Sequence, residues 1–76
     1  MAGIINPKEA EITLLIDEQG TTTYLGRAKR GTATSDAAWQ IRRITFNGTT
    51  NTFQYANGSN RYNQIWDNRT SLTYSN

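Results

Sequence analysis

Apolar and polar residues alternate near the start of the chain with the two-residue period that is typical of β-strands. Ile12, Leu14 and Ile16 form the apolar set of this first stretch. A loop at 18–20 ends in glycine, and β-favouring threonines and a tyrosine follow it. The pattern therefore predicts a β-hairpin over 11–27, with Ile12, Leu14 and Ile16 facing the core.

A small, polar segment at 29–37 separates this hairpin from a second group of strands. In the stretch 39–46, Trp39 and Ile41 share one strand face, but the opposite face also carries apolar residues. A bulge, or burial of both faces, would explain this double pattern. A polar turn with a central glycine follows, and then a short strand is predicted at 52–56.

The last part of the chain has a less regular pattern. Asn57-Gly58 predicts a tight turn, because both residues tolerate a positive φ. The stretch 60–68 fits either a strand or a helical turn, and its Asn and Gln residues favour a short helical turn or an irregular link. A final short strand is expected at 70–74.

Together these elements predict an all-β fold, a small antiparallel β-sandwich or open barrel of about five short strands. The stretch 11–76 is expected to be a single β domain. The stretch 1–10, which has few large apolar residues, is expected to be a flexible N-terminal arm. The residues predicted to form the core are Ile12, Leu14, Ile16, Tyr24, Trp39, Ile41, Phe53, Tyr55 and Leu72.

The composition limits how such a small fold is stabilised. The 76 residues include neither cysteine nor histidine, which excludes disulfides and thiolate zinc sites. A chain of this length is only marginally stable alone, so a partner chain is the expected reinforcement. The first eleven residues lack the apolar stretch of a secretory signal, and the longest apolar run, 14–16, is too short to span a membrane.

The sequence contains no recognisable catalytic constellation. The carboxylates show no spacing that selects a catalytic pair, and the serines have no histidine to activate them. Phosphate-binding loops, nucleotide fingerprints and metal-ligand clusters are also missing from the sequence. We therefore expect a non-enzymatic protein without a cofactor or a metal site.

Basic and aromatic residues are the best candidates for binding, because aromatic and arginine side chains dominate interface hot spots. Basic groups interleaved with aromatics also suit single-stranded nucleic acid, but the net charge of +2 is well below a strongly basic footprint. Eight aromatic residues raise a carbohydrate-binding alternative, with tryptophan and tyrosine side chains as stacking platforms. The candidate interface residues are Tyr62, Trp66, Arg61, Arg69, Arg27 and Arg30.

Six short segments of the chain stand out as a set. They are Tyr24-Leu25-Gly26-Arg27-Ala28, Gly31-Thr32-Ala33-Thr34-Ser35, Trp39-Gln40-Ile41-Arg42-Arg43-Ile44, Tyr55-Ala56-Asn57-Gly58, Ile65-Trp66-Asp67-Asn68-Arg69 and Ser71-Leu72-Thr73-Tyr74. Over residues 23–75 this set resembles small structural (virion) proteins of tailed bacteriophages. One departure is Arg30, where the resemblance leads us to expect a proline before Gly31.

The resemblance implies a structural component of a tailed-phage virion, as a tail or neck accessory protein or a capsid decoration. Such a protein would be made in the host cytoplasm and would bind a larger virion protein, copies of itself, or both, in multiple copies. An edge strand, the N-terminal arm and aromatic anchors are the expected contacts. The alternatives are a carbohydrate-binding adhesion module and a single-stranded nucleic-acid-binding β-barrel; a membrane is not an expected partner.

Overall fold

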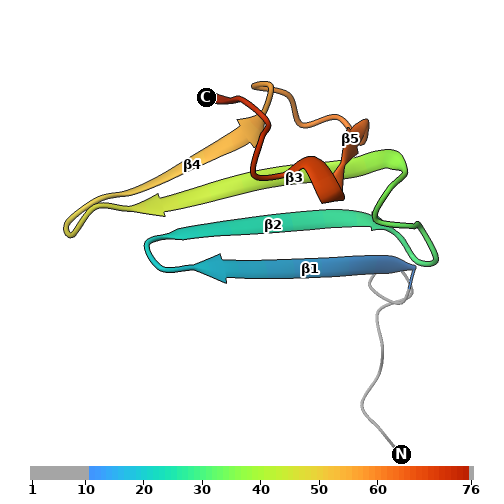
Figure 1. Cartoon of the computed structure of the whole chain (residues 1–76), viewed down its shortest axis with the longest axis horizontal. Coiled ribbons are helices and arrows are strands. Elements are labelled where there is room, and N and C mark those ends of the chain that lie inside the picture. Colours follow the sequence, from blue (N-terminus) through green and yellow to red (C-terminus); the bar gives the residue numbers. More distant parts are fainter. Residues whose placement is uncertain (1–10, 76) are drawn as a thin grey trace, which may run out of the picture.

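The protein is an open, antiparallel β-sheet, seen here in a computed structural model that describes residues 11–75 (Figure 1). The predicted N-terminal arm at 1–10 lies outside the described residues. The elements in chain order are β1 (Ile12–Gln19), β2 (Thr22–Lys29), β3 (Ala37–Phe46), β4 (Asn51–Ala56), β5 (Gln64–Ile65), the 3-10 turn η1 (Trp66–Asn68) and β6 (Tyr74–Ser75).

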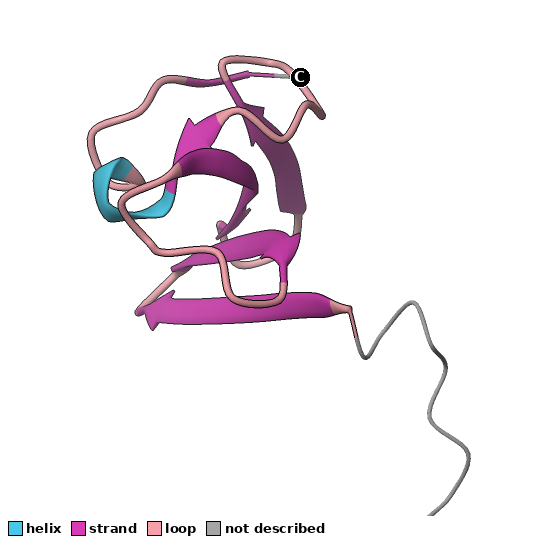
Figure 2. Cartoon of the chain, turned by 90° about the vertical axis from the view of Figure 1, so that its right-hand side faces the viewer, coloured by secondary structure: helices cyan, strands magenta, loops and turns pink. Residues whose placement is uncertain are grey.

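The sheet has the strand order β1-β2-β3-β4-β6, and β5 pairs separately with β3. Every pairing is antiparallel, which confirms the predicted all-β class. Residues 11–75 form six strands, one more than the five predicted, in an open sheet that does not close into a barrel. The stretch 60–68 contains both a two-residue strand and the 3-10 turn. The sheet is bent, and η1 lies on its concave side (Figure 2).

Tight turns join the strands where the sequence predicts them. The pairing of Gln19 with Thr22 leaves a two-residue loop between β1 and β2, one residue shorter than predicted. Its first residue, Gly20, has φ 63°, which only glycine adopts without strain at this position of a hairpin. Asn57 and Gly58 have φ 54° and 66°, so the predicted Asn-Gly turn is confirmed.

The hydrophobic core lies on the concave side of the sheet. Trp39 and Trp66 are its largest members, and their ring centroids lie 6.0 Å apart. The indole Nε1 of Trp39 donates a hydrogen bond to the carbonyl oxygen of Ala33 at 2.9 Å, so burial leaves this polar atom satisfied. The buried apolar residues are Tyr24, Ala28, Trp39, Ile41, Ala56, Trp66 and Tyr74.

Polar groups close one edge of this core. The Nε atom of Arg69 donates to the Asp17 carboxylate at 2.8 Å, and its guanidinium lies 4.7 Å from the centre of the Trp66 ring system. The Tyr74 hydroxyl donates to the carbonyl oxygen of Arg69 at 2.7 Å. These contacts tie the link after η1 to β1 and β6. Consistent with the ion pair, the hydrogen bond from Arg69 holds the pKa of Asp17 below its ordinary value.

Three of the residues predicted to form the core are exposed, so those predictions are wrong. Leu14, Ile16 and Phe53 are 63%, 64% and 58% exposed. Alternation along a strand defines two faces but does not say which of them meets the core. The answer comes from the neighbouring strand: Leu15, on the opposite face, pairs with Gly26, where the core tryptophans pack.

The remaining predicted core residues divide between the two faces. Tyr24, Trp39 and Ile41 are buried, and Leu72 packs against them while remaining half-buried. Ile12 and Tyr55 are half-buried, but they lie on the convex side with Leu14 and Phe53. The convex side therefore holds apolar residues that sequence reasoning placed inside.

The buried hydroxyl of Tyr74 makes the core less stable at alkaline pH. Burial raises the pKa of its hydroxyl from 10.0 to about 12. Between these values the unfolded chain releases the proton while the folded chain retains it, so the free energy of unfolding falls as the pH rises from about 10 to about 12. Urea unfolding should show that the free energy of unfolding falls less between pH 9 and pH 11 for Tyr74→Phe than for the unchanged protein. Equal falls in the two proteins would contradict the assignment of this pH dependence to Tyr74.

Candidate binding surface

The convex side of β1–β4 forms a continuous surface, which we call the outer face. Strand pairing places Ile16, Leu25, Arg42 and Tyr55 opposite one another in a row across all four strands. No second layer of the described residues covers this row, because the later segments that carry Trp66 pack on the concave side (Figure 2). The outer face is therefore the one broad sheet surface that residues 11–75 leave open.

Apolar side chains dominate the outer face. Leu14 and Ile16 lie on the edge strand β1, and Phe53 lies directly opposite Ile44 across β3 and β4. Soluble monomers rarely expose large contiguous apolar patches, and such patches mark interaction sites. Its most prominent apolar members are Leu14, Ile16, Leu25, Ile44, Phe46 and Phe53.

Cations are set among these apolar groups. Arg27 lies opposite Leu14 on β1, Arg42 lies between Leu25 and Tyr55, and Lys29 lies opposite Ile12. The Nε atoms of Arg27 and Arg42 are buried and have no hydrogen-bond partner among the described residues. A hollow of about 430 Å³ lies over this part of the sheet, lined by Ile12, Leu14, Arg27 and Arg42.

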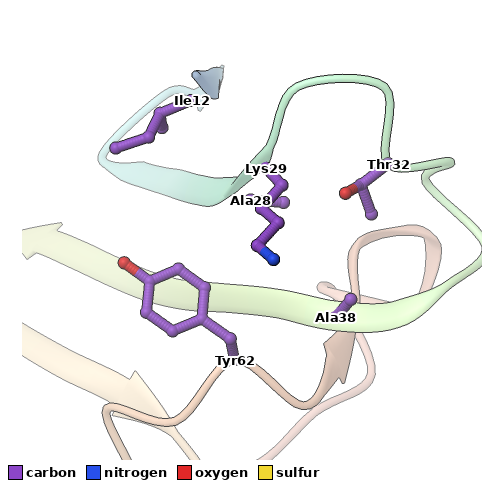
Figure 3. Close-up of a pocket in the computed structure, with 6 residues that line it drawn as sticks. All are labelled: Ile12, Ala28, Lys29, Thr32, Ala38 and Tyr62. Carbon is purple, nitrogen blue, oxygen red and sulfur yellow. The ribbon is translucent and has the colours of Figure 1, made fainter. Parts of the chain in front are cut away.

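A second pocket, of about 480 Å³, lies beside that hollow and shares Ile12 with it. Figure 3 shows the Lys29 side chain pointing into the pocket, with its amine between Tyr62 and Ala38. The lining is mostly apolar and is completed by Ala28 and Thr32. This pocket extends the outer face beyond the ends of β1 and β2.

The six candidate interface residues do not form one cluster. Arg27 lies on the outer face and Tyr62, 50% exposed, lines the adjoining pocket. Arg30 and Arg61 are exposed, whereas Arg69 is half-buried in its ion pair with Asp17.

Trp66 is buried, with 6% of its surface exposed, so its assignment as an exposed or interface residue is wrong. The reason is the glycine beneath it: the indole of Trp66 packs directly against Gly26 in the middle of β2. Trp39 is 1% exposed, so neither tryptophan offers a free ring face for a sugar. The carbohydrate hypothesis therefore loses its two tryptophan platforms, whereas Tyr62 remains exposed.

Sequence reasoning missed the outer face as a unit. The available signal was the apolar pattern on both faces of 39–46, together with the alternation of Phe53 and Tyr55 in the following strand. Registering the predicted strands against one another would have placed Leu14, Ile44 and Phe53 on the same side. That step needs the turn lengths, since each one-residue shift reverses the face.

Two kinds of feature are absent from the described residues. No cluster of three or more His, Cys, Asp or Glu side chains within 11–75 could hold a metal ion. In the same stretch, no helix has the length and apolar character needed to cross a bilayer. Comparison with known proteins finds no matching family model, no matching curated protein and no matching solved structure.

Proposed function

We propose that this chain is a structural component of a tailed-phage virion that binds a larger virion protein through its outer face and assembles in multiple copies. The observation that carries the proposal is the exposed apolar surface of the sheet, with Leu14, Ile16 and Phe53 each more than half exposed. Covering this surface with a protein partner removes apolar area from water, which is the main driving force of protein association.

The size of the outer face supports a protein partner. Four strands about 4.8 Å apart and roughly 27 Å long give a projected area on the order of 500 Å². Side-chain relief raises the accessible area above that projection, so the face approaches the ~800 Å² per partner of a standard interface. A small fold without disulfides also gains stability when such a surface is covered.

The resemblance of residues 23–75 to small phage proteins supplies the biological setting. It names no binding residues, so the assignment of the outer face rests on the physical argument. The edge strand β1 adds a second means of attachment, because one side of its backbone faces no other described strand.

A single-stranded nucleic-acid module is the second candidate. Phe46, Phe53 and Tyr55 share the outer face with Arg27 and Arg42, and base stacking beside cations is how sheet surfaces hold single strands. The net charge of +2 and the aliphatic character of the β1 side favour a protein partner instead.

The test is the copy number of this chain in purified particles of a phage that encodes it. Quantitative mass spectrometry of particles separated on a density gradient should find the chain in many copies, in a fixed ratio to a larger virion protein. Absence from particles, combined with a stable folded monomer in solution, would refute the proposal.

A further inference from the structure

We infer that the hollow between Arg27 and Arg42 on the outer face receives a carboxylate-bearing, apolar segment of a partner protein. The inference deepens the proposed function and rests on it, because it names the chemistry of the surface that the outer face would meet. Four observations carry it: the two guanidiniums, their missing acidic partners, the aliphatic lining and the charge balance of the face.

The two arginines are half-buried and have no anionic partner within the described residues. The ion pair found among residues 11–75 joins Arg69 to Asp17, on the other side of the sheet from these two arginines. The Nε atoms of Arg27 and Arg42 are buried and find no hydrogen-bond acceptor among the described residues, so these two N–H groups are unsatisfied. A carboxylate that binds the terminal nitrogens would offset this loss through charge-assisted hydrogen bonds.

The lining of the hollow indicates which side chains of the partner segment lie beside the carboxylate. Ile12 and Leu14 form its walls beside the two arginines, and the hollow holds about 430 Å³. Aliphatic walls suit apolar side chains, whereas nucleic-acid bases stack on flat aromatic rings. The aromatic residues of the outer face, Phe46, Phe53 and Tyr55, lie on β3 and β4, and none of them lines the hollow.

The charge balance of the outer face argues against a second copy of the chain as the occupant. Arg27, Lys29 and Arg42 face outward together, and among the described residues of these strands Glu18 is the acidic one on the same side. Two copies packed face to face would bring an excess of cations into one interface, which costs free energy. A partner segment that supplies carboxylates satisfies the same groups.

The test uses a dye-labelled, twelve-residue peptide of leucine and glutamate, and a matched peptide with every glutamate replaced by glutamine. Fluorescence anisotropy should show saturable binding of the glutamate peptide that weakens as salt is raised. Arg27→Gln and Arg42→Gln should each weaken binding about tenfold. Arg61→Gln, which removes the same charge from an exposed residue that does not line the hollow, should leave the affinity unchanged.

Two results would overturn the inference. One is equal affinity for the glutamate and glutamine peptides, or equal effects of Arg27→Gln and Arg61→Gln. The other is tighter binding of a labelled oligothymidylate that Arg42→Gln abolishes, which would assign the surface to nucleic acid. The copy number in particles is measured independently of the peptide titration. Failure of the titration would therefore contradict the carboxylate-binding hollow but not the virion role. Absence from particles would contradict the virion role but not the peptide result.

Discussion

Replacing Gly26 with alanine is expected to lower the free energy of unfolding by about 3 kcal/mol, a large part of the stability of so small a domain. A Cβ atom at this position would lie 2.5 and 2.6 Å from two ring carbons of Trp66, and 3.2 Å from a ring carbon of Trp39. Both indoles are buried and held from several sides, so neither can move aside without opening the core. Urea unfolding followed by tryptophan fluorescence measures the change.

A double-mutant cycle shows whether this clash is the cause. Trp66→Leu removes the ring carbons that the new Cβ would meet and is itself destabilising, since it leaves a cavity. In the Trp66→Leu background, Gly26→Ala should cost less than about 1 kcal/mol. Additive losses in the double variant would show that Gly26 matters for a reason other than the tryptophan packed on it.

Substituting threonine for Leu14, Ile16 and Phe53 together is expected to lower incorporation of the chain into particles by a factor of about 100. Each of these side chains is more than half exposed in the free chain, and covering it with a partner is worth on the order of 1 kcal/mol or more. Threonine keeps the β-propensity of the strands, so the free energy of unfolding should change little. Tagged copies per particle, counted by quantitative immunoblotting, give the measurement.

The matched control changes three exposed residues away from the outer face. Thr34, Ser35 and Thr49 are exposed in the loops before β3 and after it, and their replacement by alanine should leave incorporation unchanged. If the threonine variant enters particles as well as the unchanged chain does, the outer face is not the surface of attachment.

The first four strands could be predicted from the sequence because their local signals agree, whereas the last strand, predicted at 70–74, covers Tyr74–Ser75. The Asn57-Gly58 turn, the loop that contains Gly20 and the β-favouring runs between them each indicate one structure. The direction of the faces could not be predicted in the same way. Ile12, Leu14 and Ile16 make one side of β1 the more apolar, so the local pattern favours the side that the structure leaves exposed, and Leu15 is the one apolar residue of β1 on the side that meets the core.

What decides between the two sides is a contact distant in sequence. Trp66 closes over Gly26, and this brings the inner layer to the Leu15 side of the sheet. The sequence of β1 alone does not predict the contact between Trp66 and Gly26. The candidate binding surface could not be predicted for the same reason. Leu14 and Phe53 can be assigned to an exposed surface only when the core is known to lie on the other side of the sheet.

The central claim is that the outer face is covered when the protein is assembled. Hydroxyl-radical footprinting of the free chain and of intact particles tests it residue by residue. Leu14, Ile16, Phe46 and Phe53 are accessible in the free chain and should lose most of their labelling in particles, while side chains of the exposed loops keep theirs. Unchanged labelling of these four residues in particles that contain the chain would contradict the account.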